Sequence, residues 1–479
     1  MEKQRIPADF LIGTSSSAWQ IEGCAGKKEG QESWAELFYD TNPDIWYDDV
    51  GPKKASDFYH HYKEDIKTMA SFGMTGFRFT IQWARFMKDP IAGIVDYDAV
   101  EYYRDVIHEI KKNGMEPVIS LEHWDIPAIL FEKYNGWVGR ETVYLYEQYV
   151  KAVLKEFHKE VKLWFAFTEP NIPIDNGYMD GIWYPFKHAP KEAYQAHFHK
   201  ILATTKAVKA MEPYKEDGCR LGVMLHMTPI YARSGEARDV QAAYYADLFQ
   251  VRIYLDPYLK GEFPQELLRK LEEHNCMFAY EQADFEDIKK YRIDMLGIDY
   301  YFPIRVKARE TAYDKDVFHP EFYYEPWVMP GRKYNADRGW EIYEEAVVDI
   351  GMRIKEDYDN IPWFISENGI GIEGEDRYRN KEGYIDDDYR IDFLKGHLQR
   401  ALKVRNMGSN CFGYFVWSFV DNLSAINAFK NRYGLLELDL KTGNRIPKKS
   451  LYWFKEIMKD RSCPWCRSWH NLPAFLFQE

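Results

Sequence analysis

Residues 58–81 read FYHHYKEDIKTMASFGMTGFRFTI, and this stretch shows the repeating unit that decides the fold. Its apolar residues recur at helical spacing between positions 57 and 72, and Gly73 follows as the expected C-cap. A run of aromatic and β-branched residues at 76–81 then predicts a strand. An amphipathic helix followed by a short buried strand is typical of α/β proteins.

The same order of helix and strand recurs along the chain. Residues 98–113 repeat the helical spacing, Gly114 closes that helix, and a strand candidate follows. The strand candidates lie near residues 10–16, 76–81, 117–121, 163–168, 220–225, 295–301, 362–366 and 412–417. Eight such units predict one (β/α)8 TIM barrel with long βα loops, formed by residues 1–479 as a single domain. An open doubly wound sheet is the alternative, but no Gly-rich phosphate loop follows the first strand.

Composition excludes several classes of protein. The net charge of −13 disfavours nucleic acid and anionic membrane surfaces as partners. No stretch approaches 18 uncharged apolar residues, so no membrane span is expected. The N-terminus lacks the apolar core of a signal peptide and is expected to form the first strand, which favours a cytoplasmic protein. The excess of aromatic residues, 17% of the chain, favours a carbohydrate site because sugar rings stack on aromatic faces.

The six cysteines are mostly far apart and are typical of a reduced cytosolic protein. Cys463 and Cys466 form a CxxC pair, which could be half of a redox or metal site. Because no second CxxC is present, we expect no metal there.

Reactive side chains fall at one end of the predicted strands. At or just past the C-terminal ends of separate strand candidates lie His123, Trp124, Glu169, Tyr301, Glu367 and Trp417. In a barrel these ends converge on one face, where such enzymes carry their active sites. The pattern therefore predicts an active site.

Two of these residues are glutamates that directly follow apolar strands. Glu169 ends the run LWFAFTE and Glu367 ends the run IPWFISE. Burial at such an edge raises the pKa of a carboxyl group, and glycoside hydrolysis needs two carboxyl groups in different protonation states. A separation of about 5–5.5 Å would give retention of configuration. The structural alternative is that each glutamate pairs with a basic residue at the barrel rim.

At this point the sequence resembles glycoside hydrolase family 1, the β-glucosidase and 6-phospho-β-glucosidase group, over essentially its whole length. The matching motifs are FLIGTSSSAWQIEG from Phe10, FRFTIQW from Phe77, LEHWDIP from Leu121, GWEIY from Gly339, ISENG from Ile365 and VWS from Val416. The ISENG motif, which contains the family's nucleophile, is the most specific of them.

The resemblance implies roles for individual residues. Glu169 would be the acid/base and Glu367 the nucleophile, while Arg78 and Tyr301 would keep Glu367 ionised. The substrate-binding residues would be Gln20, His123, Trp124, Thr168, Trp340, Trp417, Ser424 and Tyr433. Trp340 would stack against the aglycone. The resemblance implies no metal and no cofactor.

Two departures from the family lie beside the catalytic residues. Thr168 stands where the family has an asparagine that binds the sugar 2-hydroxyl, and it offers one hydroxyl in place of an amide. Asp299 also replaces an asparagine and adds a second acidic group near Tyr301 and the nucleophile.

Two further departures follow the eighth strand. Typical β-glucosidases carry a glutamate there that grips the 4- and 6-hydroxyls, whereas this chain has Ser424 and Ala425. This pair resembles the 6-phospho-β-glycosidase branch, in which a serine, a later lysine and a tyrosine bind the 6-phosphate. Tyr433 has the right spacing, but Asn431 fills the lysine position and Lys430 lies one residue away.

The sequence thus predicts a retaining β-glycosidase that acts on a β-linked, glucoside-like small molecule with a non-standard sugar or aglycone. A 6-phospho-β-glucosidase is the first alternative. A catalytically weak sugar-binding protein on the same fold is the second, because Thr168 and Asp299 depart from the family pattern. The oligomeric state stays open, and a homo-oligomer is compatible with the sequence.

Overall fold

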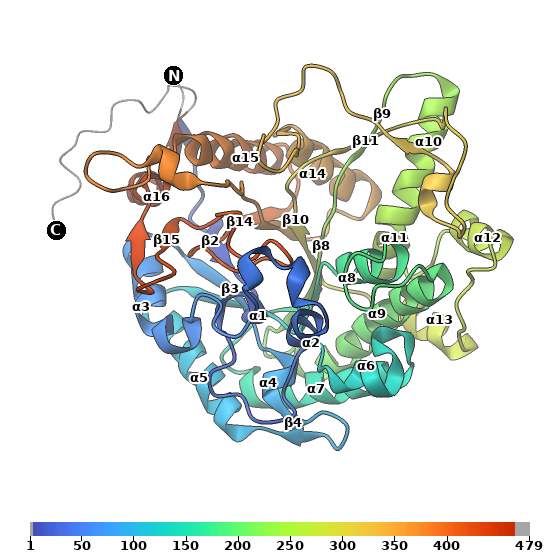
Figure 1. Ribbon diagram of the computed structural model, residues 1–479, viewed down its shortest axis with the longest axis horizontal. Helices are drawn as coiled ribbons and strands as arrows, with labels where there is room; N and C mark the ends of the chain where they lie inside the picture. Colours follow the sequence, from blue (N-terminus) through green and yellow to red (C-terminus); the bar gives the residue numbers. More distant parts are fainter. Residues whose placement is uncertain (1–2, 465–479) are drawn as a thin grey trace.

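The structure is a computed structural model that describes residues 3–464. Within this range, eight parallel strands close into a barrel at the centre of the molecule (Figure 1). In order of pairing they are β10 (Met295–Asp299), β13 (Trp363–Glu367), β14 (Cys411–Trp417), β2 (Leu11–Ser15), β3 (Gly76–Thr80), β6 (Glu116–Ser120), β7 (Leu163–Thr168) and β8 (Arg220–Leu225). β8 pairs with β10 and completes the ring.

Each predicted strand coincides with one strand of this barrel, so the predicted (β/α)8 fold is confirmed. An open sheet is ruled out because β14 pairs with β2, which joins the last strand of the ring to the first. That residues 1–479 form one domain stays a prediction.

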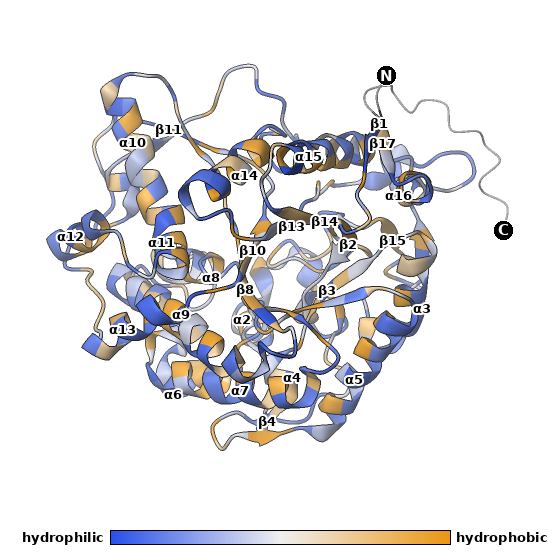
Figure 2. Cartoon of the chain, turned by 180° about the vertical axis from the view of Figure 1, so that it is seen from behind, coloured by the Kyte–Doolittle hydropathy of each residue, from blue (hydrophilic) through white to orange (hydrophobic). Residues whose placement is uncertain are grey.

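Helices surround the barrel (Figure 1), and hydrophilic and hydrophobic residues alternate along them (Figure 2). The main helices are α3 (Phe58–Ser71), α5 (Tyr97–Lys112), α7 (Glu141–Phe157), α9 (Pro190–Met211), α10 (Ala237–Asp247), α11 (Ile253–Leu259), α12 (Gln265–Glu273), α13 (Gln282–Lys290), α14 (Ala346–Asp357), α15 (Asp388–Asn406) and α16 (Lys449–Lys459). The C-caps of α3 and α5 are Phe72 and Asn113, one position before the predicted glycines. Gly73 and Gly114 have φ of +88° and +75°, a left-handed conformation that ends a helix and that glycine adopts without strain.

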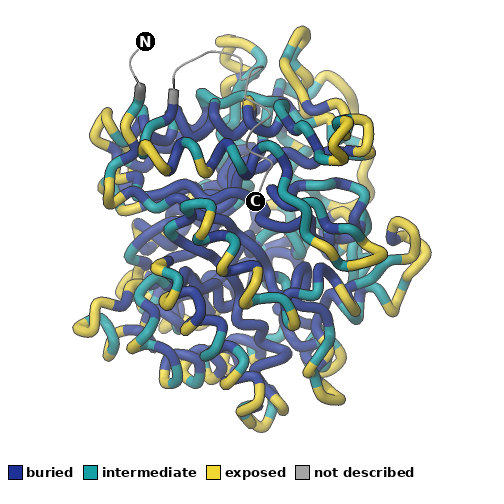
Figure 3. The backbone as a smooth tube through the Cα atoms, turned by 90° about the vertical axis from the view of Figure 1, so that its left-hand side faces the viewer, coloured by how far each residue is buried: buried dark blue, intermediate teal, exposed yellow. Residues whose placement is uncertain are grey.

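Side chains fill the inside of the barrel, and Figure 3 shows this interior as buried. The filling cluster consists of Val118, Phe165, Met224, Met295, Phe364 and Phe415. Glycines make room for the rings, since a Cβ on Gly76 would lie 2.6 Å from Cζ of Phe415. The barrel is therefore a packed core, and a ligand can bind only where the loops extend beyond the strands.

Long loops on the C-terminal side of the strands carry small elements of their own. β9 (Ile230–Ala232), β11 (Ile304–Lys307) and β12 (Glu325–Pro326) form a three-stranded sheet beside α10. Two hairpin-like pairs are formed by β4 (Met87–Asp89) with β5 (Ile94–Val95) and by β15 (Leu436–Leu438) with β16 (Arg445–Pro447). Within residues 3–464, no helix has both the length and the apolar character needed to cross a bilayer.

The two ends of the described chain also pair with each other. β1 (Lys3–Arg5) precedes the strand that the sequence suggested as the first, and it pairs with β17 (Ser462–Pro464). Cys463 is buried in this pair, and burial raises the pKa of its thiol to about 12. A thiol that stays protonated is a poor nucleophile and metal ligand, which disfavours a redox or metal role. Cys466 lies outside the described residues.

Candidate active site

A pocket of about 390 Å³ opens at the C-terminal ends of the barrel strands. Its lining consists of Gln20, His123, Trp124, Glu169, Ile172, Asn176, Trp183, His226, Tyr301, Phe302, Arg338, Trp340, Glu367, Trp417, Ser424, Ala425, Asn427 and Tyr433. These residues lie at the C-terminal ends of seven different barrel strands or on the loops that follow them. The pocket thus collects nearly all the site residues that the sequence suggested.

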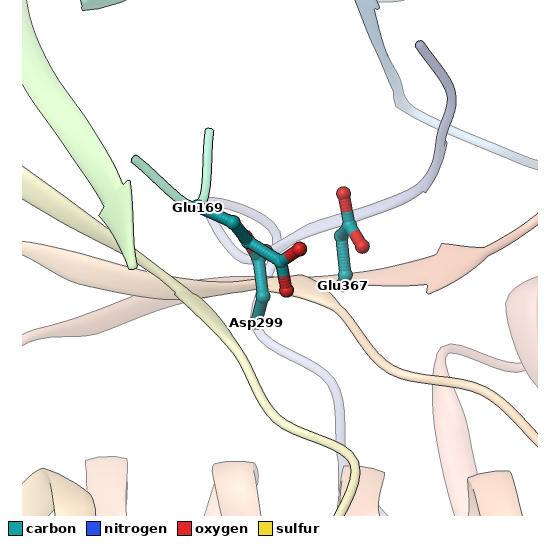
Figure 4. A group of neighbouring side chains, drawn as sticks. All are labelled: Glu169, Asp299 and Glu367. Carbon is teal, nitrogen blue, oxygen red and sulfur yellow. The ribbon is translucent and has the colours of Figure 1, made fainter. Parts of the chain in front are cut away.

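Three carboxyl groups meet in this region, from Glu169, Asp299 and Glu367 (Figure 4). One oxygen of each lies within 4.8 Å of an oxygen of each of the others. In an inverting enzyme the two carboxyl groups lie farther apart, because a water molecule must fit between the base and the sugar carbon. The spacing of Glu169 and Glu367 is too short for this. It suits direct attack of one carboxylate on the sugar while the other transfers a proton.

Glu367 is the last residue of β13, a strand that is buried along its whole length. Arg78, from β3, forms a fully buried ion pair with it, and the Tyr301 hydroxyl donates a hydrogen bond of 2.7 Å to its Oε2. Burial and the charge of Glu169 raise the pKa of Tyr301 well above its usual range, so the phenol remains a donor. A cation and a donated hydrogen bond both favour the ionised form of a carboxyl group.

His123 extends this network to the pocket wall. Its Nδ1 lies 2.9 Å from Nη1 of Arg78, which also donates to the carbonyl of Ser16. Burial, helped by the charge of Arg78, lowers the pKa of His123 well below its usual value. The neutral ring therefore accepts from Arg78 through Nδ1, and its proton on Nε2 is available to a sugar hydroxyl.

Glu169 directly follows β7 and has a left-handed backbone, with φ of +46°. Such a conformation is uncommon for a residue other than glycine and is found mostly where function requires a particular direction of the side chain. The indole N–H of Trp124, which is also left-handed with φ of +60°, donates to the Glu169 carbonyl at 3.2 Å. This turn brings the Glu169 carboxyl group to the pocket wall.

His226 is a site residue that the sequence analysis missed. Its Nδ1 lies 3.4 Å from Oε1 of Glu169. Burial acts to lower the pKa of His226, but the hydrogen bond and charge of Glu169 outweigh it and raise the pKa. The signal that could have found it is its place directly after β8, the same rule that located Glu169.

Aromatic rings build the rest of the wall. Trp417, Tyr301 and Tyr433 form a buried cluster, and Phe302 and Trp340 pack against it. Gln20, in α1 (Ala18–Ile21), is held by a 2.6 Å hydrogen bond from its Nε2 to the carbonyl of Leu423. Flat rings beside a fixed amide are the usual components of a carbohydrate site, because C–H faces stack and hydroxyls hydrogen-bond.

Comparison with known proteins agrees with this geometry. The model of glycosyl hydrolase family 1 matches residues 2–463. The chain belongs to glycosyl hydrolase family 1. It is 45% identical, over 95% of its length and 98% of the relative's, to 6-phospho-beta-glucosidase GmuD of Bacillus subtilis strain 168. It is 33% identical to a 6-phospho-beta-galactosidase of Clostridium acetobutylicum, over 95% of this chain and 97% of that one.

The structure also superposes well on solved structures of the family. A family 1 β-glucosidase from Thermotoga maritima superposes with a TM-score of 0.87 at 26% identity, over 96% of this chain and 99% of that one. The protein is therefore a retaining β-glycosidase of family 1.

Asp299, one of the two departures near the family 1 catalytic residues, lies beneath the pocket. Its Oδ1 accepts a 2.6 Å hydrogen bond from Oγ of Ser366, and its buried Oδ2 has no hydrogen-bond partner within residues 3–464. Burial and the nearby charge of Glu169 raise the pKa of Asp299 to about 8. At neutral pH the group is mostly protonated, so it adds little negative charge next to the catalytic pair.

This pKa predicts a pH-dependent stability. An unfolded chain releases the Asp299 proton near pH 4, whereas the folded protein keeps it until about pH 8. Stability therefore falls as pH rises from about 4 to 8, and an asparagine would remove this fall. We expect Asp299→Asn to raise the thermal midpoint at pH 8 by several degrees and to change it little at pH 4. Thermal melts from pH 4 to pH 9 measure the difference, with the exposed Asp316→Asn as control. A midpoint difference that is the same at all pH values would contradict it.

Thr168, the other departure, is fully buried and does not line the pocket. Its hydroxyl lies 2.8 Å from that of Ser120 and 3.4 Å from Sδ of Met224, at a register shift between β7 and β8. A direct contact of Thr168 with the sugar stays a prediction, and its hydroxyl already has two partners inside the barrel.

Only some of the phosphate-binding residues expected on the loop after β14 line the pocket. Ser424, Ala425 and Tyr433 line the pocket. Asn431 is buried away from the pocket lining, and Lys430 lies outside it, with its Nζ 3.2 Å from Oε1 of Glu373. The structure adds pocket residues that sequence reasoning did not select: Ile172, Asn176, Trp183, His226, Phe302, Arg338 and Asn427.

Proposed function

We propose that this family 1 enzyme hydrolyses a 6-phospho-β-glycoside, with 6-phospho-β-glucosides as the preferred class. The observation that carries the proposal is the composition of the pocket. Within the described chain, its only carboxylates are Glu169 and Glu367. Ser424 and Ala425 line the region where typical β-glucosidases carry a glutamate, and a glutamate there would repel a phosphate group.

The relatives support the same choice. Two of them, at 45% and 33% identity, are named for phosphorylated glucose and phosphorylated galactose, respectively. We therefore rank a phosphorylated sugar above the unphosphorylated one that the sequence alone favoured. Because phosphorylated sugars are metabolites of the cell interior and the five described cysteines are all free thiols, we also propose a cytoplasmic location.

We propose that catalysis proceeds in two displacements. Glu169 donates its proton to the glycosidic oxygen while a carboxylate oxygen of Glu367 attacks C1, so the bond to the aglycone breaks and a glycosyl ester forms. Glu169 then removes a proton from water, which attacks C1 and releases the sugar and free Glu367. Arg78 and Tyr301 hold Glu367 ionised before each cycle. The two inversions at C1 give net retention.

Initial rates on matched chromogenic substrates test the proposal. We expect kcat/KM for nitrophenyl 6-phospho-β-glucoside to exceed that for nitrophenyl β-glucoside by about 10²-fold or more, because the phosphate adds charge-assisted contacts. Nitrophenyl 6-phospho-β-galactoside shows whether the 4-hydroxyl matters. Equal rates on the phosphorylated and plain glucosides would contradict the proposal.

A sugar-binding protein without efficient catalysis is not favoured by the site. A buried ion pair between Arg78 and Glu367 costs desolvation energy, and binding a neutral sugar does not require it. Treatment with a 2-fluoro glycosyl fluoride distinguishes the two cases: an enzyme forms an ester on Glu367 that mass spectrometry detects, whereas a binding protein stays unmodified.

A further inference from the structure

A phosphorylated substrate requires a cationic side chain that binds its phosphate group. Asn431 occupies the position of the expected lysine and carries no charge. Lys430 lies outside the pocket lining, its side chain is 39% exposed, and it pairs with Glu373. The loop after β14 therefore presents hydroxyl groups to the pocket without a cation of its own.

Arg338 supplies a cation from a different loop. It lies between β12 and α14 in the chain, yet it lines the same pocket as Ser424, Asn427 and Tyr433. It is the only Lys or Arg side chain among the described lining residues. Arg338, on the loop after β10, thus lines the same pocket as residues of the loop after β14.

Arg338 is not neutralised by a carboxylate. Within residues 3–464 Arg338 forms no ion pair, although the acidic residues Asp337 and Glu341 lie close to it in the sequence. Both of these acids pair with other cations, Asp337 with Arg377 at 2.8 Å and Glu341 with Arg305 at 2.7 Å. Glu373, which binds Asp337 through its backbone N–H, pairs with Lys430 at 3.2 Å. A positive charge left over in this way attracts an anionic group of a ligand.

The guanidinium group is also held in place. Its Cζ lies 4.3 Å from the ring centroid of Trp340, and that ring packs on Phe302 with 4.7 Å between centroids. Nε of Arg338 is buried and has no hydrogen-bond partner within the described chain. A planar guanidinium fixed on an aromatic ring is suited to bidentate binding of phosphate oxygens, because little freedom is lost when the ligand arrives.

Tyr433 lies close enough to be affected by this charge. Burial raises the pKa of Tyr433, and the charge of Arg338 opposes the rise. The phenol stays protonated at neutral pH and can donate a hydrogen bond to a phosphate oxygen.

We propose that Arg338 is the cation that binds the 6-phosphate, with the hydroxyls of Ser424 and Tyr433 as its partners. This inference rests on the proposed function. Under this proposal Trp340 has two roles: it supports the guanidinium group that binds the phosphate, and it stacks against the aglycone.

Three variants test this inference. We expect Arg338→Met to lower kcat/KM for nitrophenyl 6-phospho-β-glucoside by about 10²-fold, mainly through KM, and to leave kcat/KM for nitrophenyl β-glucoside within about threefold. Arg338→Lys should recover part of the loss, since it keeps the charge but not the planar fork. Lys430→Met, the matched control, removes the neighbouring cation outside the pocket and should leave the preference for the phosphorylated substrate intact. Inhibition by inorganic phosphate should weaken only in the Arg338 variants.

The outcomes separate the two proposals. If the wild-type enzyme shows no preference for the phosphorylated substrate, the proposed function fails and the role of Arg338 fails with it. If the wild type shows the preference and Arg338→Met keeps it, only the role of Arg338 is overturned. Loss of the preference in Lys430→Met would assign the phosphate to Lys430 instead. Equal losses on both substrates in Arg338→Met would show a structural role and would also overturn the inference.

Discussion

Replacing Glu367 by alanine is expected to lower kcat by about 10⁴-fold or more, because the first displacement loses its nucleophile. Arg78 and Tyr301 remain, and together they form a site for a small anion where the carboxylate was. Added azide or formate should therefore restore part of the activity. Azide then attacks C1 directly and inverts it once, so the product should be the α-glycosyl azide, which NMR identifies.

Glu122→Ala is the matched control for this rescue. Glu122 is also buried near a strand end, but it pairs with Lys200 at 3.2 Å and does not line the pocket. Its loss should reduce stability and should show no gain from azide. Substantial hydrolysis by Glu367→Ala in the absence of added anions would contradict the assignment of Glu367, as would azide rescue in Glu122→Ala of the same size.

Replacing Glu169 by alanine should have an effect that depends on the leaving group. For nitrophenyl substrates, whose leaving group is weakly basic, the first displacement needs little proton transfer, so its rate should fall only modestly. For alkyl or sugar aglycones it should fall by about 10³-fold or more, since general acid catalysis contributes most to poor leaving groups. Azide should speed the second displacement, because it needs no base, and should give the β-glycosyl azide after two inversions.

The opposite azide products of the two variants make the assignments separable. His226→Gln serves as a control for Glu169, since it removes the ring that lies 3.4 Å from the carboxyl group and leaves the carboxyl group itself. We expect this control to shift the pH profile while the reactivity order of leaving groups stays that of the wild type. A uniform loss in Glu169→Ala over all leaving groups would rule out Glu169 as the acid.

The barrel could be predicted from the sequence because its strands are buried on both faces. Such strands appear as short apolar runs, and their common direction places the residues after them at one end. Glu169 and Glu367 were found by this rule, and His226, directly after β8, could have been. The rule works because it depends on local sequence and on one property of the fold.

Other site residues could not be predicted in this way. Arg338 does not directly follow a barrel strand but lies about 40 residues past the end of β10; it reaches the pocket because its loop folds back toward the loop after β14, whose pocket residues are about 90 positions away in the sequence. Thr168 precedes Glu169, yet a register shift in β7 turns its hydroxyl into the barrel, toward Ser120. Loop paths and local strand irregularities depend on tertiary packing, and the sequence pattern carries no direct sign of them.

Closure of the ring by β2 and β14 has a consequence for synthesis of the protein. Leu11 and Gly413 are register partners, and Gln20 is held by the carbonyl of Leu423. A nascent chain on the ribosome therefore cannot complete its barrel, or its sugar site, until nearly all of it has been translated. Until then β2 lacks one of its two neighbours and leaves an unpaired strand edge, which makes the growing chain prone to aggregation.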